Sequence, residues 1–537
     1  MEIPGTEILN NWTLWTLVEE RSSLGDKPML TVDADETITY RELYERSKRV
    51  AASLHRLGVA PGETIASIGY NSTDQAVLLY ACAAIGAVWV PLNLSLVGDD
   101  LVYTLNDTNS VNLVIDAELV PKYQEVANRV AIQRVFVRGE GQYDTSQYGS
   151  FVDLANADAG DFKPAPCEPQ EAIAVIYTGG STGLPKGVLA SHTYFLAFGL
   201  RYQEIAEATP DDIHYTGALQ LYHVGGQQFT IIGPMLCGMS SHISRWFSAS
   251  KYWERARACS ATIIDPNGPM MATIMRQPPS ELDTQHNVRI AVGAGTGSVS
   301  DDVRDGFADR FKVPLMGVYA QTEVGGCLWC SERMYERRLG SCGKPGQWGE
   351  VAVVDERDRP VPPGTVGELV ARPTYPNTFM IGFLNKPEQA VRAWRNLWHH
   401  TGDLGYLDED GFVYFIGRQA HWLRRRGENI SSYEVEQCID HVPGVVEVAV
   451  VGVPDLEIGE EDVKAFVVAD ENSGVTAEAV HAFCSENLAY FKVPRYIEFV
   501  DTLPHSAAKN EIERHKLKNL PLGDCWDART AIQAASK

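Results

Sequence analysis

Residues 177–187 read YTGGSTGLPKG, a segment whose residue types suit the binding of phosphate. Its four glycines free the backbone to present N–H groups to phosphate oxygens, and Thr178, Ser181 and Thr182 add hydroxyl donors. Lys186 adds a mobile positive charge. The segment is not a Walker loop, because a proline precedes the lysine and no Ser or Thr follows it. A solvated turn is the ordinary alternative, but the length of the run favours a phosphate-binding loop.

This loop resembles the signature of the adenylate-forming superfamily, which comprises acyl-CoA synthetases, adenylation domains and luciferases. A second match follows in the order of that family, at YAQTE, Tyr319 to Glu323. The resemblance implies that Tyr319 stacks on adenine, Thr322 binds the α-phosphate and Glu323 holds Mg²⁺. The residue types suit these roles, because they supply a flat π face, a hydroxyl donor and a hard oxygen ligand.

Two more segments extend the resemblance to ribose and adenine. HTGDLGYLDEDGFVYFIGR, residues 400–418, resembles the segment whose Asp chelates both ribose hydroxyls, which assigns that role to Asp403. Arg418 can donate to ribose or phosphate. GAGTG, Gly293 to Gly297, lacks the GxGxxG spacing of a dinucleotide-binding fold and resembles the adenine-lining turn. For Asp403 and Arg418, the ordinary alternatives are an aspartate in a turn and an ion pair at the end of a strand.

The acyl side of the site is indicated by YHVGG, Tyr222 to Gly226, which resembles the segment whose His borders the acyl pocket. A lone His at a strand end is more often structural, so His223 carries both interpretations. RGENISSYEVE, Arg426 to Glu436, resembles the loop that opens the C-terminal domain and lines the tunnel for a thiol acceptor. WFSASKYWERAR and FCSENLAYFKVPRYIEF resemble most the carnitine and crotonobetaine CoA-ligase branch.

The C-terminal lysine of the family is the main departure. Members place a Lys just before an Ile or Val in a stretch of the type LP…GKI…K, where it bridges the acyl carboxylate and the α-phosphate. This chain reads LPHSAAKNEIERHKLK, which aligns Glu511 with that Lys and leaves Lys509 two residues earlier. A Glu would repel polyphosphate, whereas a Lys stabilises charge at the reacting centre. Lys509 is therefore the candidate, beside the alternative of an exposed loop lysine. Ala420 also stands where members usually carry a hinge Asp or Lys.

These segments predict an AMP-forming ligase that uses ATP, Mg²⁺ and, by family default, coenzyme A. The carboxylate of a small-molecule acid would attack the α-phosphate in line, with catalysis by positioning and charge stabilisation. The predicted nucleotide-binding residues are Thr178, Gly179, Gly180, Ser181, Thr182, Gly183, Lys186, Gly293, Ala294, Gly295, Tyr319, Ala320, Gln321, Thr322, Asp403 and Arg418. The predicted catalytic residues are Thr178, Lys186, His223, Glu323 and Lys509, with Glu323 as the metal ligand.

Three alternatives stay open. One is a different acceptor, as in amide-forming ligases or in ATP-dependent diazotases that activate nitrite, and the Glu511 departure supports its consideration. The second is a non-catalytic nucleotide-binding protein, and the third is a phosphate-loop NTPase. The acid is open as well, because Asp265 in ATIIDPNGPM could favour an amine-bearing substrate, but an Asp before Pro is more often a turn former.

The elements that position these residues follow from hydrophobic periodicity. Polar helical stretches alternate with short apolar runs over residues 39–93, as in α/β layering, and AIAVIY, Ala172 to Tyr177, predicts a buried strand before the phosphate loop. Alternating runs from Gly349 to Phe415 predict a small β subdomain. We therefore expect an α/β protein with an adenylating region at residues 1–418, comprising two α/β layers and a small β-barrel-like subdomain. A smaller, mobile α+β lid would follow at residues 419–537.

Length, composition and charge agree with such an enzyme. A chain of 537 residues is longer than one hydrophobic core normally serves. Its composition, with 45% hydrophobic and 22% charged residues, is that of an ordinary globular protein. The net charge of −24 argues against a general nucleic-acid or anionic-membrane partner. The N-terminus lacks a basic segment followed by an apolar run, so we expect a cytoplasmic protein, for which a homodimer is a possible assembly. Cys327 and Cys330 form a CxxC without a second ligand pair, which favours a structural role.

Overall fold

The structure is a computed structural model of the whole chain. It describes all residues except 1–4, 142, 145, 181–182, 296–300, 326–337, 339, 419–421, 426–427, 456–459, 471–472, 506–511 and 531–537. The predicted site residues Ser181, Thr182 and Lys509 lie outside the described residues, as do Glu511, Ala420, Cys327 and Cys330.

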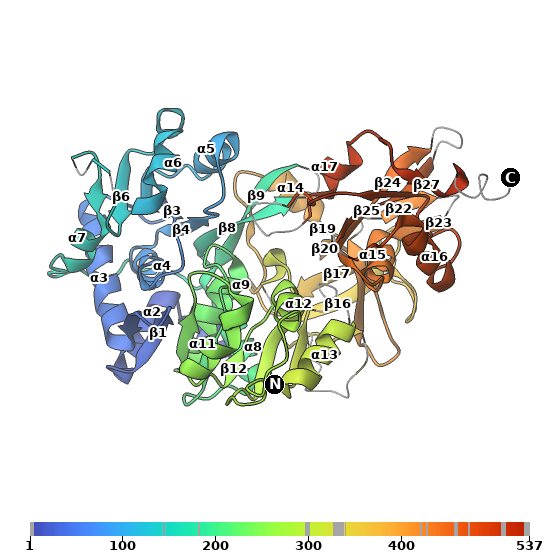
Figure 1. The fold of residues 1–537 in the computed structure, drawn as a ribbon. Helices are drawn as coiled ribbons and strands as arrows, with labels where there is room; N and C mark the ends of the chain where they lie inside the picture. The colour runs from blue at the N-terminus through green and yellow to red at the C-terminus, as the bar shows by residue number, and fades with distance from the viewer. Residues whose placement is uncertain are drawn as a thin grey trace.

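Two large sheets form most of the region before Arg418 (Figure 1). The first has eight strands, in the order β18 (Gly382–Phe383), β9 (Gly183–Ser191), β8 (Ala172–Gly180), β4 (Val88–Leu92), β3 (Thr64–Ile68), β5 (Asn112–Asp116), β6 (Arg134–Arg138) and β7 (Gly149–Ser150). The second has seven strands, in the order β14 (Leu315–Val318), β13 (Ile290–Gly295), β12 (Ile263–Ile264), β10 (Ile213–Tyr215), β11 (Ser240–Ile243), β1 (Pro28–Val32) and β2 (Glu36–Thr39). Most pairings are parallel, and continuous apolar runs such as VWVPL in β4 are buried throughout.

Helices cover these sheets, as the alternating sequence pattern predicts. Thr39 caps α3 (Tyr40–Arg56) in a reciprocal capping box with Glu42, and α4 (Thr73–Ile85) is buried almost throughout. The remaining α-helices described in this region are α1 (Thr6–Asn11), α2 (Leu14–Arg21), α5 (Gly98–Asp107), α6 (Val120–Gln124), α7 (Phe151–Asn156), α8 (His192–Ala206), α9 (Val224–Gly226), α10 (Gly233–Cys237), α11 (Tyr252–Ala258), α12 (Gly268–Met275), α13 (Asp301–Phe311) and α14 (Pro387–Ala393). None of the helices in the described part of the chain combines the length and apolar character that crossing a bilayer requires.

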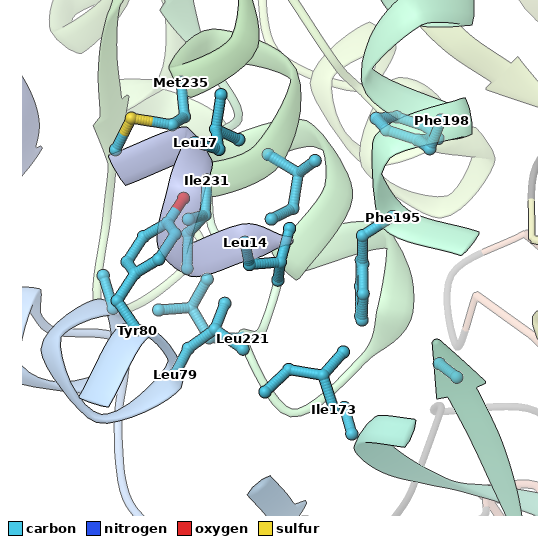
Figure 2. Close-up of a cluster of buried hydrophobic side chains, with 14 of the residues drawn as sticks. Leu14, Leu17, Leu79, Tyr80, Ile173, Phe195, Phe198, Leu221, Ile231 and Met235 are labelled. Atoms are coloured by element: carbon cyan, nitrogen blue, oxygen red, sulfur yellow. The ribbon is translucent and has the colours of Figure 1, made fainter. Parts of the chain in front are cut away.

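The principal core joins helices with the phosphate-loop strand. Figure 2 shows Leu14 of α2, Tyr80 of α4, Ile173 of β8 and Phe195 of α8 pointing into one cluster, and all four are buried. Because β8 continues from this cluster into the glycine-rich segment, the core fixes the strand that carries the predicted phosphate loop.

A six-stranded sheet follows, and the predicted small β subdomain is confirmed. Its strands are β15 (Ser341–Gly343), β16 (Gly349–Val354), β17 (Gly367–Pro373), β19 (Trp394–Arg395), β20 (Trp398–Leu407) and β21 (Val413–Arg418). Strands β20 and β21 are antiparallel, and their register sets Asp403 opposite Arg418. Two residues that lie fifteen positions apart in sequence are therefore neighbours.

The C-terminal elements gather at one end of the molecule, in orange to red in Figure 1. They are β22 (Trp422–Arg425), β23 (Glu428–Ser431), α15 (Ser432–Asp440), β24 (Val445–Asp455), β25 (Glu460–Ala469), α16 (Ala477–Asn487), β26 (Tyr496–Phe499), α17 (Arg514–Lys518) and β27 (Trp526–Asp527). Buried residues such as Val435, Val463 and Val480 form a core of their own, as expected of an α+β unit. His441 contacts Asp302 of α13 at 3.0 Å, which connects this unit to the preceding region.

Candidate active site

The phosphate-loop segment forms the tip of a β-hairpin. Strands β8 and β9 pair antiparallel, with Thr178 opposite Lys186 and Gly180 opposite Gly183. The predicted strand is therefore longer than AIAVIY and continues through Gly180, because the glycines join the ladder. The hairpin brings Thr178 and Lys186 together, as a shared phosphate site requires.

Side chains from α5 and the β18–α14 connection hold the base of this hairpin. The Tyr177 hydroxyl donates to Asp107 at 2.8 Å, and the Lys386 ammonium lies 3.1 Å from the same carboxylate. The Tyr103 hydroxyl donates to the Pro185 carbonyl at 3.1 Å. No local pattern in the sequence points to Tyr103, Asp107 or Lys386, since only the tertiary fold brings them to the loop.

A buried carboxylate, Asp403, organises the opposite side of the site. Its Oδ2 accepts hydrogen bonds of 2.7 Å from the Tyr319 hydroxyl and 2.7 Å from the Gln321 amide. Its Oδ1 lies 3.7 Å from Arg418 Nε. The structure thus brings together Tyr319, Gln321, Asp403 and Arg418, which come from two of the predicted segments.

Asp403 has spare capacity to accept hydrogen bonds. Burial raises its pKa to about 6, although Arg418, Tyr319 and Gln321 act in the opposite direction. Among the described residues, its Oδ1 has no hydrogen-bond donor. A buried acceptor in this state fits a ligand that brings hydroxyl groups, which is what ribose would supply.

The backbone around Thr322 and Glu323 is held from several directions. The Tyr194 hydroxyl donates to the Thr322 carbonyl at 2.8 Å, and the Gln228 amide donates to the Gly325 carbonyl at 3.0 Å. Gly325 has a φ of +66°, and a Cβ there would lie 2.7 Å from the Thr378 carbonyl oxygen. The Glu323 side chain is half-buried, and its negative charge contributes to raising the pKa of Asp403, while its role as a metal ligand stays a prediction.

His223 lies on the phosphate-loop side. It lines one small cavity together with Thr178, Pro185 and Asn93. The chain turns sharply between Gln220 and Gly226. A Cβ on Gly226 would therefore lie only 2.1 Å from the Gln220 carbonyl oxygen. The structure therefore places His223 beside Thr178 of the predicted phosphate site, while its predicted role at the acyl pocket stays a prediction.

The adenine-lining turn lies at the end of β13, next to the strand that carries Tyr319. Ala294 pairs with Gly317 and Gly295 with Val318 of β14. Gly293 has a φ of +85°, in the left-handed region that favours glycine. Ala320 is exposed directly after Tyr319. The predicted segments are thus adjacent in space, while the roles of their residues stay predictions.

Comparison with known proteins identifies the family. The AMP-binding enzyme family matches residues 19–380, and the AMP-binding enzyme C-terminal domain matches residues 434–510. The chain belongs to the AMP-binding enzyme family. The crotonobetaine/carnitine–CoA ligase of Escherichia coli O139:H28 is 31% identical over 484 residues, which are 89% of this chain and 93% of that protein. This enzyme is therefore an AMP-forming ligase of the acyl-CoA synthetase type.

Solved structures confirm the fold class of this AMP-binding enzyme. The anthranilate CoA ligase AuaEII, in complex with anthranoyl-AMP, matches with a TM-score of 0.85 and 24% identity over 99% of this chain and 100% of that chain. ATP-bound MatB from Rhodopseudomonas palustris matches with a TM-score of 0.83 and 26% identity over 94% of this chain and 98% of that chain. The α/β region with its smaller C-terminal unit is thus a known arrangement.

Proposed function

We propose that this enzyme activates a small carboxylic acid with ATP and transfers the acyl group to coenzyme A. The observation that carries the proposal is the cluster of Tyr319, Gln321 and Arg418 around the buried acceptor Asp403. Such a cluster suits a nucleoside, and the hairpin with Thr178 and Lys186 suits its phosphates. We place the boundary between the adenylating region and the lid near Arg418.

The protein would act mainly by positioning. Tyr319 would contact adenine, Asp403 would accept the ribose hydroxyls, and Thr178 and Lys186 would bind phosphate oxygens. Glu323 would hold a magnesium ion, which neutralises charge on the phosphates when it is bound. Lys509 is proposed to approach the reacting carboxylate from the lid.

The reaction has two steps. A carboxylate oxygen attacks the α-phosphorus, the bond to the bridging oxygen breaks, and pyrophosphate leaves with that electron pair. The product is a mixed anhydride of the acid and AMP. The sulfur of coenzyme A then attacks its carbonyl carbon, AMP leaves, and the thiol proton passes to solvent. A thioester, AMP and pyrophosphate are the products.

Product analysis tests this proposal. The purified enzyme would be incubated with ATP, Mg²⁺, coenzyme A and a panel of acids, and nucleotides and thioesters would be separated by chromatography with mass detection. We expect AMP, pyrophosphate and one thioester, only when the matching acid is present. Release of ADP would contradict the proposal and indicate an NTPase.

Two further arms separate the remaining alternatives. Omitting coenzyme A and adding amines tests amide formation, and nitrite with aryl amines tests diazotisation. Absence of ATP–pyrophosphate exchange with every acid and with nitrite would indicate a protein that only binds nucleotide. A cytoplasmic location and a homodimer stay predictions, for which cell fractionation and light scattering are the direct measurements.

A further inference from the structure

A largely buried ion pair joins separate elements at the base of the phosphate hairpin. Asp107 is the last residue of α5, and Lys386 directly precedes α14. The Lys386 ammonium lies 3.1 Å from each oxygen of the Asp107 carboxylate. The side chains of Asp107 and Lys386 are only 12% and 17% exposed. Water and salt therefore screen this pair less than they screen a pair on the surface.

The same carboxylate holds the strand that leads into the phosphate loop. The Tyr177 hydroxyl of β8 donates to Asp107 at 2.8 Å. Burial raises the pKa of the Tyr177 hydroxyl, and its hydrogen bond to Asp107 raises it further, so the hydroxyl stays protonated and able to donate. Tyr177 directly precedes Thr178, to which we assign phosphate binding. Asp107 thus links the outgoing strand of the hairpin to Lys386.

The returning strand of the hairpin is held by the segment that carries Lys386. The Lys186 ammonium lies 5.3 Å from the centroid of the Phe383 ring in β18, and Phe383 pairs with Val188 of β9. The Leu384 N–H donates to the Gly187 carbonyl at 2.8 Å. Aromatic faces attract cations, so Phe383 holds the charge of Lys186 on this side of the hairpin. Residues 383–386 and Asp107 therefore contact both strands.

A glycine-rich hairpin needs such support from its neighbours. Residues 177–187 include four glycines, which leave the backbone many accessible conformations. Phosphate binding requires N–H groups, hydroxyls and a positive charge at fixed positions, and a displacement of about 1 Å in a site can cost about 100-fold. A charged anchor at the base of the hairpin limits the directions in which its tip can point.

We propose that Asp107 and Lys386 are positioning residues for the polyphosphate of ATP. Their ion pair fixes the direction of the hairpin, so it controls how tightly the phosphates bind without affecting how tightly the nucleoside binds. The inference rests on the function proposed above, because it takes the hairpin as the phosphate site. Lys386 acts through Asp107 and Tyr177, and its own ammonium group does not bind phosphate.

Calorimetry with two ligands tests the inference. ATP with Mg²⁺ occupies the whole proposed site, whereas adenosine occupies only the nucleoside part around Asp403. The ratio of their dissociation constants therefore isolates the contribution of the phosphates. We expect unmodified enzyme to bind ATP at least about 100-fold more tightly than adenosine. In Asp107→Asn and in Lys386→Met, this ratio should fall about tenfold, while the dissociation constant of adenosine changes less than about twofold.

The two substitutions also distinguish positioning from direct phosphate binding by Lys386. If Lys386 bound phosphate itself, Asp107→Asn would free its charge and tighten ATP binding, whereas Lys386→Met would weaken it. Positioning predicts that both substitutions weaken ATP binding. Lys386→Arg keeps a cation beside the carboxylate, so its ratio should stay within about threefold of that of the unmodified enzyme.

Tyr177→Phe is the variant that disturbs the fold least, and it decides the outcome if the charge variants do not fold. It keeps the ring and removes only the hydroxyl that donates to Asp107. The ratio should therefore fall about threefold, as for one lost hydrogen bond. Melting temperatures report whether each variant is folded.

Asp283→Asn is the matched control. Asp283 pairs with Arg310 of α13 at 2.8 Å, and the two side chains are 14% and 15% exposed, close to the values for Asp107 and Lys386. This pair lies next to the strands of the seven-stranded sheet, whereas the hairpin belongs to the eight-stranded sheet. The ratio should therefore be unchanged in Asp283→Asn.

The inference is overturned if the folded variants keep the ratio of the unmodified enzyme, or if ATP and adenosine lose affinity equally. It is also overturned if Asp107→Asn binds ATP more tightly, or if Asp283→Asn lowers the ratio as much. If the ratio falls as expected but no acid releases AMP, the proposed function fails alone. If the unmodified enzyme binds ATP no more tightly than adenosine, the hairpin is not a phosphate site, and both proposals fail.

Discussion

Two buried aspartates differ in what surrounds them. Asp403 accepts hydrogen bonds from Tyr319 and Gln321 and lies beside Arg418, and its pKa is about 6. Asp265 rests on the backbone of Gly293, without a donor to its Oδ2 among the described residues, and burial raises its pKa well above the ordinary range. The protein thus supplies hydrogen-bond donors to the Asp403 carboxylate, whereas the described residues supply none to Asp265 Oδ2.

This difference indicates what kind of ligand each carboxyl group could bind. A carboxylate that its neighbours already hold in place suits a ligand that never varies, because the geometry of the binding site need not change. A buried carboxyl group without a partner instead discriminates between ligands, since only a ligand with a donor or a charge removes the cost of its burial.

The largest effect is expected from Asp403→Ala. We expect kcat/KM for ATP to fall about 100-fold, because the ribose loses a charged acceptor and two protein donors lose their partner. AMP release at varied ATP concentration measures it. Asp410→Ala is the control, since this exposed carboxylate pairs with Arg338 at the turn between β20 and β21, and surface pairs contribute little. Equal losses in the two variants would contradict the special role of Asp403.

Gly293→Ala should have the next largest effect, on stability. We expect a loss of about 2 kcal/mol, because the new Cβ meets the Asp265 carboxyl group and alanine is strained in the left-handed region. Thermal unfolding measures it. Gly58→Ala is the control, since its φ of +84° is similar and nothing lies within 4 Å of an added Cβ.

The Gly293 clash also predicts non-additivity. In an Asp265→Ala background the carboxyl group is gone, so Gly293→Ala should cost less, and only the backbone strain should persist. A fully additive double variant would show that the two residues do not touch.

A pH dependence of nucleoside affinity is expected next. In the proposed complex, ribose hydroxyls would donate to the ionised form of Asp403, whose pKa burial raises to about 6. Protonation therefore weakens binding, and affinity should fall about tenfold from pH 7 to pH 5 and level off above pH 7. Calorimetry with adenosine measures it, because adenosine has no phosphate that titrates there. Asp403→Asn should remove the dependence, and its persistence in that variant would assign it to another group.

Tyr319→Phe should give the smallest effect. It keeps the ring and removes only the hydroxyl that donates to Asp403, so we expect KM for ATP to rise about fivefold, as for one lost hydrogen bond. Steady-state kinetics measure it. Tyr406→Phe is the control, because Tyr406 stacks on Tyr414 at 4.6 Å on the same hairpin as Asp403. An unchanged KM in Tyr319→Phe would show that the hydroxyl does not organise Asp403.

Much of the nucleotide side could be predicted from residue order. The apolar run before Tyr177 predicts β8, and the glycines with Thr178 and Lys186 predict a phosphate site, because local periodicity and composition specify both. The β subdomain could be predicted in the same way, because alternating apolar residues and turn residues indicate two neighbouring strands. These strands are β20 and β21, and their pairing brings Asp403 close to Arg418.

The tertiary structure was needed for contacts between distant segments. Asp107 reaches Tyr177 across seventy positions, and Tyr319 reaches Asp403 across eighty-four. No local pattern encodes such contacts, because they depend on how sheets and helices pack. For Asp265 the sequence favoured a turn former over a ligand, and only the tertiary structure showed that its carboxyl group packs against Gly293 and that its Oδ2 has no donor among the described residues. Chemical identity is a property of the residue, whereas burial and hydrogen bonding are properties of its neighbours.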